Sequence, residues 1–265
     1  MTRPFHMPRF FMTTPTPCPY LSGRQERKIF TRLSGEDPTE LHNVLAELGF
    51  RRSQNIAYRP ACDGCSACVS VRINVTDYRF KKSDRRILNR NSDLVPEPQT
   101  ATATLEQYHL LRRYLNGRHQ DGGMADMDAF DYRSMVEDSP IDTFIFEYRA
   151  ADGKTTTDQG DTDNTPEAPL AAACLTDVVS DGLSMVYSFF DPELTQRSLG
   201  SYMILHHIET ARQFGLPYVY LGYWVENCQK MQYKARFQPL EQLTESGWRP
   251  MRSDAPMQQA PEAQT

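Results

Sequence analysis

The sequence predicts an α+β protein in two parts, and three observations lead to this prediction. A chain of 265 residues suffices for one large hydrophobic core or two modest ones. The first 95 residues combine one amphipathic helix pattern with alternating strand patterns. The rest gives the order helix, three strands, helix, strand and helix. We therefore expect a small cysteine-containing basic α+β domain over 1–95 and a mixed α/β domain over 96–250.

The N-terminal part opens with a Pro- and Thr-rich stretch that we expect to be extended. A helix then begins at Asp37, which has the residue type of an N-cap, and it is followed by Pro38 at the first helical position and Glu40 at the third. Gly49 ends this helix. Alternating apolar residues predict strands over 50–60 and 69–75, and residues 77–92 are strongly basic. The prolines of 95–98 suggest a linker.

The second part is punctuated by clear start and stop signals. Asp181-Gly182 is a strong hairpin turn, and Gly215-Leu216-Pro217 ends a helix. The Thr-, Asp- and Gly-rich stretch 151–169 reads as a disordered insertion, and 251–265 reads as a disordered tail. The expected helices are 105–115, 128–137, 198–214 and a basic, aromatic 227–236, and the expected strands are 143–149, 171–179, 183–190 and 217–224.

Charge is distributed unevenly along the chain. The formal net charge is −5, yet residues 1–100 hold 16 Lys and Arg against 10 Asp and Glu. This imbalance suggests a local anionic partner, although a solvated basic face is the alternative. No apolar run approaches the roughly 20 residues of a membrane span, and no secretory signal is evident. We expect a soluble, cytoplasmic protein with no membrane partner.

Four of the six cysteines, Cys18, Cys62, Cys65 and Cys68, lie in the first quarter of the chain. Six cysteines in a cytoplasmic chain do not suggest a disulfide framework. Four thiolates suffice for a zinc ion or an iron–sulfur cluster, so this set is a candidate metal site. A reduced loop without metal is the alternative.

The segment Arg197-Ser-Leu-Gly200-Ser-Tyr202 is similar to the phosphate-binding loop of the N-acetyltransferase superfamily, except that Tyr202 replaces a small residue. Backbone N–H groups at such a helix start favour an anion. Together with the order of elements, this resemblance implies an N-acetyltransferase-like (GNAT-type) acyltransferase fold in which Arg197 and Gly200 contact the acyl donor.

Five separate segments of the chain together resemble the arginyl-tRNA–protein transferase family, above all its bacterial aspartate/glutamate leucyl-transferase branch. This resemblance implies transfer of leucine from Leu-tRNA to the N-terminal α-amine of proteins that begin with Asp or Glu, which marks them for N-degron (N-end rule) proteolysis. Some relatives hold a cluster with N-terminal cysteines. The segments are 17–24, 58–68, 114–121, 183–192 and 221–224 with 230–234.

The implied chemistry needs no enzyme nucleophile or cofactor, because the tRNA ester is already activated and the attacking group is an α-amine with a pKa near neutrality. Alignment of the reactants and stabilisation of the oxyanion then remain for the protein. An acidic acceptor side chain needs a nearby cation. Lys230, Lys234 and Arg236, beside Tyr233, are the candidates, with a solvated helix face as the alternative.

Further candidate residues lie in the segments that carry the resemblance. Groups that orient the amine or relay its proton are Tyr187, Asp191, His119 and Asp121, with core packing or a turn as the alternative. Tyr223 and Trp224 are candidates for stacking on the terminal adenine or for lining the leucyl pocket, with packing as the alternative. The candidates for tRNA phosphate contacts are Arg72, Arg79, Lys81, Lys82, Arg85, Arg86 and Arg90.

Three other functions compete with leucyl transfer. An arginyl-transferase with the same acceptors would differ in its donor pocket, which the sequence does not reveal. A small-molecule N-acetyltransferase would leave the basic N-terminal part unexplained. A non-catalytic, metal-containing RNA-binding protein would explain 51–90 and the cysteines, but it would leave the 183–237 segments without a role.

Overall fold

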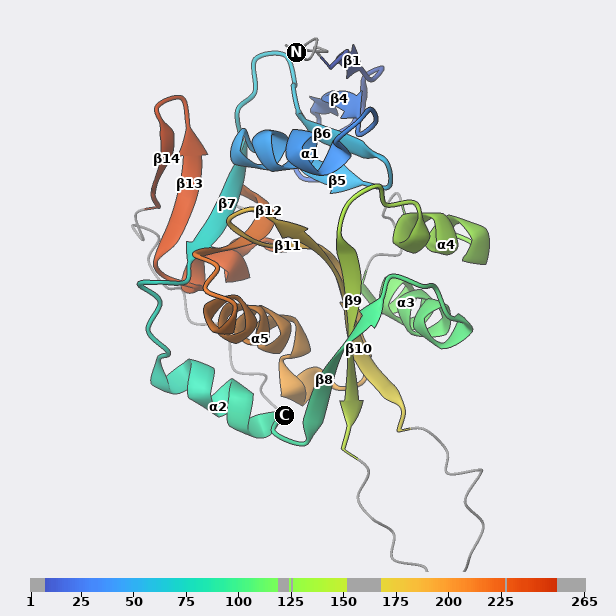
Figure 1. Ribbon diagram of the computed structural model, residues 1–265, viewed down its shortest axis with the longest axis vertical. Helices are drawn as coiled ribbons and strands as arrows, with labels where there is room; N and C mark the ends of the chain where they lie inside the picture. The colour runs from blue at the N-terminus through green and yellow to red at the C-terminus, as the bar shows by residue number, and fades with distance from the viewer. Residues whose placement is uncertain (1–7, 119–123, 125, 152–167, 227, 252–265) are drawn as a thin grey trace, which may run out of the picture.

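The computed structural model describes residues 8–118, 124, 126–151, 168–226 and 228–251, and the other residues lie outside this description. His119, Asp121, most of the expected insertion and all but the first residue of the expected tail are among those outside. The described chain forms one large mixed sheet with helices on both faces and a smaller N-terminal unit on top (Figure 1). The α+β class is confirmed.

The large sheet contains strands from both halves of the chain. Its strands are antiparallel to their neighbours except for the parallel pair β11 and β12. The order across the sheet is β14 (Gly247–Pro250), β13 (Leu240–Thr244), β7 (Cys68–Asn74), β12 (Tyr218–Val225), β11 (Gly182–Phe190), β10 (Leu170–Val179), β9 (Thr143–Ala150) and β8 (Leu94–Thr100).

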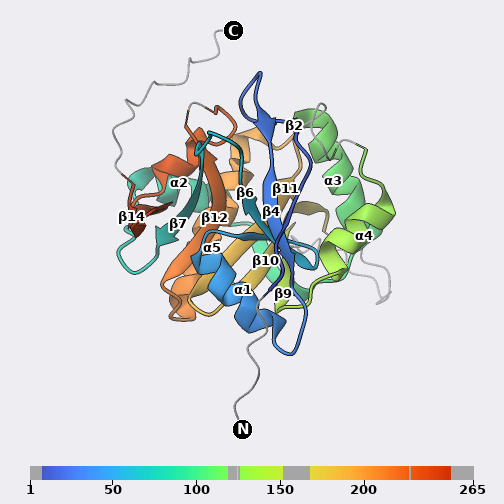
Figure 2. The ribbon, with the colours of Figure 1, turned by 90° about the horizontal axis from the view of Figure 1, so that it is seen from above.

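Two helical layers cover this sheet. On one face, α5 (Leu199–Gln213) shares a core with Ile87 of α2 (Lys82–Arg90) and with the centre of the sheet. On the other face, α3 (Leu105–Arg118) and α4 (Ala129–Glu137) pack over β9, β10 and β11. Figure 2 shows α3 and α4 together on one side and α2 on the opposite side. A short 3-10 helix, η1 (Thr195–Arg197), precedes α5, and another, η2 (Gln232–Arg236), follows β12.

The N-terminal unit lies beside α3 and α4 on the second face. Its helix α1 (Pro38–Glu47) begins as expected, since the Asp37 carboxylate accepts a hydrogen bond from the Glu40 backbone N–H. Ala46 of this helix packs against Val179 and Tyr220 of the large sheet. The remaining strands form a sheet in the order β1 (Phe11–Met12), β4 (Lys28–Arg32), β6 (Ile56–Pro60) and β5 (Arg51–Ser53), and a pair of β2 (Thr16–Pro17) with β3 (Gln25–Glu26).

Two sequence expectations about elements are wrong. Residues 95–98 are not a linker but part of the edge strand β8, where Pro96 and Pro98 are tolerated because residues two apart direct their nitrogens to the same, unpaired side. The expected helix over 227–236 is only the five-residue η2. Backbone hydrogen bonds from Met231 to Cys228 and from Lys234 to Met231 span three residues, as in a tight 3-10 turn.

The expected domain boundary near residue 95 does not coincide with a break in the large sheet. Strands β7 and β8 precede or cross this position, yet both are part of the large sheet. The N-terminal part therefore contributes a central strand to the surface on which the later segments build the site.

Candidate functional site

The candidate site lies where the parallel strands β11 and β12 separate. Their pairing joins only Gly182 to Tyr218, Leu183 to Val219 and Ser184 to Tyr220. Beyond this point β11 continues beside β10, while β12 continues beside β7. Separating strands leave backbone groups that other parts of the chain must satisfy. We call the space between the separating halves of β11 and β12 the strand gap.

Arg51, from β5 of the N-terminal unit, reaches the strand gap. Its guanidinium donates hydrogen bonds to Ser184 Oγ, 3.2 Å away, and to the Met185 carbonyl, both on β11. On the opposite side lies Gly222 of β12, at φ +78°, where an added Cβ would stand 3.2 Å from the guanidinium carbon. Glycine therefore permits both the backbone conformation and the close approach of Arg51.

Lys234 approaches the same gap from η2. Its Nζ donates hydrogen bonds to the carbonyls of Leu221, 2.9 Å away, and Tyr223, 2.7 Å away. Leu221 lies at the irregularity in β12 between Tyr220 and Gly222, and Tyr223 follows directly after it. Burial, and then the positive charge of Arg51, lower the pKa of Lys234 to about 7. Lys234 therefore shares the strand gap with a second cation.

The other candidates for acceptor binding lie further out. Lys230 and Tyr233 are exposed on the segment around η2. Arg236 extends away from the strand gap, and its guanidinium lies 3.5 Å from the Asp84 carboxylate and 3.5 Å from Ser201 Oγ. Only Lys234 of this group is placed in the gap itself.

Tyr223 and Trp224 point to opposite sides of β12. The Tyr223 hydroxyl lies 3.0 Å from the carbonyls of both Gly49 and Tyr58 in the N-terminal unit. Trp224 packs against the core that contains α5, and its Nε1 is buried without a hydrogen-bond partner in the described chain. An unpaired buried N–H is costly, so Trp224 Nε1 is a candidate donor to a ligand.

Two of the proposed amine-orienting residues lie beside α3. Tyr187 packs under α3 and α4, and burial raises the pKa of its hydroxyl well above the ordinary value. Asp191 accepts hydrogen bonds from Arg113, 3.2 Å away, and from the Glu193 backbone N–H. Because Gly117 stands against Pro192, the end of α3 and the end of β11 meet, which brings together two of the segments noted in the sequence.

The start of α5 forms the other border of the region. Arg197 makes a two-bond ion pair with Asp93, with distances of 2.7 and 3.1 Å, and this pair lowers the pKa of Asp93. The side chain of Asn91 at the end of α2 donates to the Arg197 carbonyl. An added Cβ at Gly200 would stand 3.3 Å from the ring of Phe190. The structure therefore ties the loop before α5 to the basic helix α2.

Six of the seven basic residues expected to contact tRNA are exposed on or beside α2. The Lys81 ammonium donates to the Arg236 carbonyl, 3.3 Å away, so this basic surface continues to η2. We call it the α2 basic face, and it consists of Arg79, Lys81, Lys82, Arg85, Arg86 and Arg90.

Arg72 does not belong to the α2 basic face, so its expected phosphate contact is corrected. Its guanidinium is buried between the rings of Tyr218, 3.4 Å from the ring centre, and Trp248, 4.3 Å away. It also pairs with Glu241 at 2.9 Å and Asp181 at 3.4 Å. The alternation that places Arg72 on β7 directs it into the structure rather than toward solvent.

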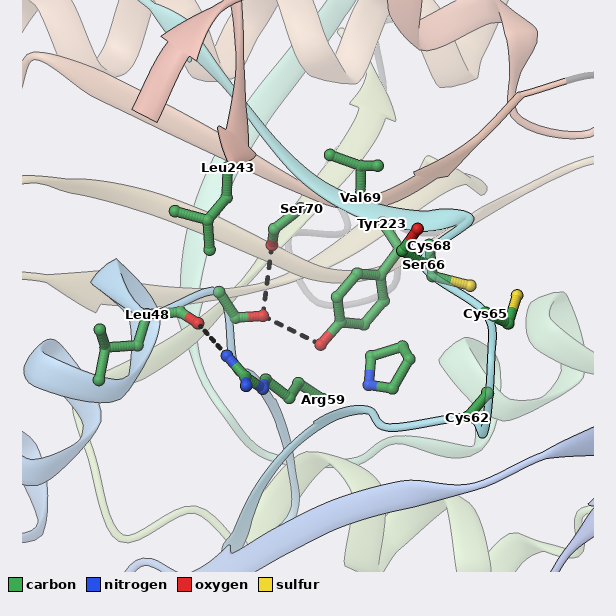
Figure 3. A pocket seen from close by; sticks show the side chains of 12 residues that line it. Leu48, Arg59, Cys62, Cys65, Ser66, Cys68, Val69, Ser70, Tyr223 and Leu243 are labelled. Atoms are coloured by element: carbon green, nitrogen blue, oxygen red, sulfur yellow. Dashed lines mark hydrogen bonds between the residues drawn. The ribbon is translucent and has the colours of Figure 1, made fainter. Parts of the chain in front are cut away.

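The cysteine cluster borders two cavities. A larger cavity of about 260 Å³ lies between the N-terminal unit and strands β7, β12 and β13, and Figure 3 shows Tyr223, Arg59 and three of the cysteines around it. All four cysteines line a smaller cavity of about 80 Å³ beneath Tyr20. Within the described residues, no group of three or more Cys, His, Asp or Glu side chains is arranged to hold a metal ion. The fit to a metal is therefore incomplete.

The four thiols differ in their surroundings. Burial, and then the nearby Cys18, raise the pKa of Cys68 to about 11. A backbone hydrogen bond from Ala67, and then the Arg24 guanidinium 3.3 Å from its sulfur, lower the pKa of Cys65. Cys65 is thus the thiol among them that the structure favours as a thiolate.

Sequence reasoning missed Arg51. It lies in a short hairpin more than 130 residues before its β11 partners, and no local motif marks it. The available signal was the run Arg51-Arg52, two adjacent charges within a strand pattern whose residues are otherwise expected to alternate between core and solvent.

In the described part of the chain, no helix is long and apolar enough to cross a bilayer.

The order helix, three strands, helix and strand that the sequence predicts for the second part is present, and β11 and β12 form its parallel pair. The models of one family match most of the described chain. The model for the N-terminus of arginine-tRNA-protein transferase matches residues 16–86, and the model for its C-terminus matches residues 106–244. The chain belongs to the arginine-tRNA-protein transferase family.

Bacterial relatives match over nearly their full length. An aspartate/glutamate leucyltransferase of Parvibaculum lavamentivorans is 58% identical over 242 residues, which cover 91% of this chain and 94% of the relative. A protein of the same name from Bradyrhizobium sp. (strain ORS 278) is 54% identical over 260 residues, or 97% of this chain and 96% of the relative. Another from Methylorubrum populi is 53% identical over 247 residues, covering 93% and 98% of the two chains.

Similarity to solved structures is weaker. A structure of L-PGS from Bacillus licheniformis aligns with a TM-score of 0.44 at 8% identity, over 64% of this chain and 52% of that one. A crystal structure of FemX aligns with a TM-score of 0.43 at 11% identity, over 72% and 61% of the two chains.

Proposed function

We propose that this protein transfers leucine from Leu-tRNA to the N-terminal α-amine of proteins that begin with Asp or Glu. The names of its relatives support leucine as the transferred group and Asp and Glu as the acceptor residues. The observation that carries the proposal in this chain is the continuity of the α2 basic face with η2 and the strand gap. A tRNA held along α2 would thus present its leucine-bearing end beside the two buried cations, Arg51 and Lys234.

The reaction needs positioning more than it needs chemical activation. The acceptor α-amine attacks the ester carbonyl carbon of Leu-tRNA, and a peptide bond forms as the bond from that carbon to the ribose oxygen breaks. The proton lost by the amine goes to the leaving ribose oxygen, which thereby becomes a hydroxyl. Holding the two reactants in register supplies several kcal/mol, on the order of 7 or more in favourable cases.

Several residues have proposed roles in this reaction. We assign Trp224 Nε1 the role of donating a hydrogen bond to the donor end, because this buried N–H lacks a partner in the described chain. We assign Asp191, beside the end of α3, the role of orienting the amine, and its ion pair with Arg113 supports this proposal. His119 and Asp121, which lie outside the described residues, have the same proposed role. The outer cations Lys230 and Arg236 guide the acidic acceptor toward the gap by charge.

A transfer assay tests the proposal. Purified protein is incubated with radiolabelled Leu-tRNA or Arg-tRNA and with reporter proteins that begin with Asp, Glu, Arg or Ala. The expected result is leucine incorporation into the Asp and Glu reporters alone. Arginine incorporation would replace the donor in the proposal, and binding of tRNA without any transfer would favour a non-catalytic RNA-binding protein.

The cellular role follows from the product. Addition of leucine gives an N-terminus that marks the acceptor for N-degron proteolysis, and we place this activity in the cytoplasm, where charged tRNA is available. If this role holds, a reporter beginning with Asp should be longer-lived in cells that lack the gene, and reintroduction of the gene should restore its turnover.

Metal binding by Cys18, Cys62, Cys65 and Cys68 also stays a proposal. Their approach to one small cavity supports it, while their arrangement would have to tighten around an ion. A bound zinc ion or cluster would fix the loop of Cys62, Cys65 and Cys68, which lines the same cavity as Tyr223. No reaction step depends on it. Iron and zinc analysis of anaerobically purified protein should find about one site per chain. Contents below about a tenth of an equivalent would contradict the proposal.

A further inference from the structure

The strand gap holds two buried cations without a buried anion. Arg51 is 8% exposed, and its guanidinium bonds only neutral groups, Ser184 Oγ and the Met185 carbonyl. The Lys234 ammonium likewise bonds only carbonyls. Among the described residues, no carboxylate lies within ion-pair distance of either cation. Burying charge without an opposite charge is costly, so this arrangement is unusual.

Other arginines of the described chain show what is missing. Arg52, the next residue, has a fully buried side chain that pairs with Asp177 at 2.6 Å. Arg72 pairs with Glu241 at 2.9 Å, and Arg149, which is partly buried, pairs with Glu147 at 2.9 Å. The chain thus supplies a carboxylate for each of these guanidinium groups, whereas Arg51 and Lys234 lack one.

We propose that Arg51 and Lys234 together bind the side-chain carboxylate of the acceptor's first residue in the strand gap and so select acceptors that begin with Asp or Glu. This inference rests on the proposed function for the identity of the ligand. An external carboxylate would supply the anion that the gap lacks, with the guanidinium providing paired donors and the ammonium a compact charge.

The surroundings of the gap favour a carboxylate over a tRNA phosphate. Arg51, which belongs to the N-terminal unit, is buried, whereas Lys234 is partly exposed as a residue although its ammonium is buried. A ligand would therefore enter beside Lys234, from the η2 side. The exposed α2 basic face already offers several cations to a phosphate backbone. A short acidic side chain that enters the gap would leave its own α-amine at the rim, beside the donor ester.

Acceptor discrimination provides the first test. Transfer rates are measured for reporters that begin with Asp or Asn, using the wild-type protein, Arg51→Gln, Lys234→Met and the control Arg32→Gln, which removes an exposed arginine of the same N-terminal unit. We expect the Asp-to-Asn ratio of kcat/KM to fall by about 30-fold or more in Arg51→Gln and Lys234→Met, and to stay unchanged in the control. Comparing two reporters within one variant cancels general losses of activity.

Thermal melts and tRNA binding accompany these assays. The expected tRNA affinity of both gap variants is within about threefold of wild type, since the phosphates bind elsewhere. An unchanged Asp-to-Asn ratio in a folded gap variant would overturn the proposal. A loss of tRNA affinity without a change in that ratio would assign the gap to a phosphate and overturn it as well.

A second test uses the unsubstituted protein, so it does not depend on the folding of a variant. Lysine labelled at the Cε carbon reports the ionisation of Lys234 by NMR. A saturating peptide that begins with Asp should raise the pKa of Lys234 above about 7, whereas the matching Asn peptide should not. The same response to both peptides would overturn the proposal. Failure of leucine transfer in the wild type would contradict the proposed function. The NMR comparison of the Asp and Asn peptides would still decide whether Arg51 and Lys234 bind a carboxylate, because it needs no transfer reaction.

Discussion

Gly222 is the residue that lets Arg51 and β12 occupy adjacent space. We predict that Gly222→Ala destabilises the protein through its φ of +78° and also displaces the Arg51 guanidinium, which stands 3.2 Å from the added Cβ. The loss should be about 1–3 kcal/mol of unfolding free energy, together with a clear drop in transfer. Urea unfolding and kcat/KM for an Asp reporter measure the two effects.

Gly215→Ala is the matched control for that substitution. Gly215 has a similar φ of +68°, but an added Cβ there would have no neighbour within 4 Å among the described atoms. The Gly215→Ala variant should therefore lose only about 1–2 kcal/mol of unfolding free energy, from the strained backbone, and keep its transfer rate. Equal effects of the two alanines on transfer would contradict a role for the Arg51 contact.

Two buried histidines, His42 and His207, and the partly buried His206 predict acid sensitivity. Burial lowers the pKa of His42 and of His206 to about 4, and that of His207 to about 3, from an ordinary value of 6.5. The three histidines therefore become protonated near pH 6.5 in the unfolded chain, but only near pH 4 or below in the folded chain. The contribution of these histidines to the unfolding free energy should be constant above about pH 7 and fall as pH decreases from 6.5 toward 4.

Urea unfolding at pH about 7.5 and about 5 measures this loss, which can reach about 1.4 kcal/mol per pH unit for each histidine. His207→Gln should reduce the slope, because the His207 ring is buried between Thr176 and the Met203 carbonyl. The exposed His109 of α3 is the control, and His109→Gln should leave the slope as it is. A stability that does not change over this range would refute the prediction.

At the level of elements, we expect the exposed charges of α2 to contribute to RNA binding but not to the stability of the fold. Lys82, Arg85 and Arg86 are exposed on this helix and have no ion-pair partner in the described chain. Replacing all three by Gln should weaken tRNA binding at low salt and reduce the salt slope by roughly 2–3. The thermal midpoint should stay within about 2 °C, because exposed charges contribute little to folding.

The control for α2 is Arg133→Gln on α4, which removes one exposed cation on the other face of the sheet. It should change neither the tRNA affinity nor its salt dependence. If the triple variant binds tRNA as tightly as wild type at low salt, the RNA must bind elsewhere on the protein.

Elements defined by local signals were predictable from the sequence, whereas those defined by distant partners were not. The Asp37 cap and the hairpin signal at Asp181-Gly182 lie within a few residues of what they determine, and the cap and the hairpin are both present. The two turn residues are Ser180 and Asp181, because Gly182 already pairs with Val179 as the first residue of β11. The prolines of β8 suggested a linker because the sequence does not reveal that this strand pairs on one side only. The hairpin of β13 and β14 was missed for lack of a strong turn signal.

The same distinction applies to the candidate site. Charge and aromatic content pointed correctly to the region around η2, where Lys234 reaches β12. Charge alone did not separate the exposed cations of α2 from Arg72, which stacks inside the structure. Arg51 became visible only when strands from distant parts of the chain were placed around it.

For the whole molecule, Asp177 of β10 joins the N-terminal unit to the large sheet. Its carboxylate accepts two hydrogen bonds from Arg52 of β5, at 2.6 and 2.8 Å, and one from Thr143 Oγ1 of β9 at 2.8 Å. Asp177→Asn would leave the buried Arg52 charge unpaired. We predict a loss of about 3–5 kcal/mol of unfolding free energy, measured by urea unfolding at neutral pH.

An exposed ion pair provides the comparison for Asp177. Glu137 pairs with Arg133 at 2.7 Å on the surface of α4, and Glu137→Gln should cost far less than Asp177→Asn because solvent screens this pair. Similar losses for the two substitutions would show that the Asp177 contacts do not hold the two parts together.

Strand β7 has a consequence for how the chain acquires its shape. It is synthesised early and ends at Asn74, yet its neighbours in the sheet, β12 and β13, begin only at Tyr218 and Leu240. A nascent chain that has reached the middle of its length therefore carries an unpaired, apolar central strand, which is the kind of surface that chaperones protect. Such distant pairing also slows folding. Splitting the gene between the two matched segments should give fragments that aggregate when made separately and recover activity only when made together.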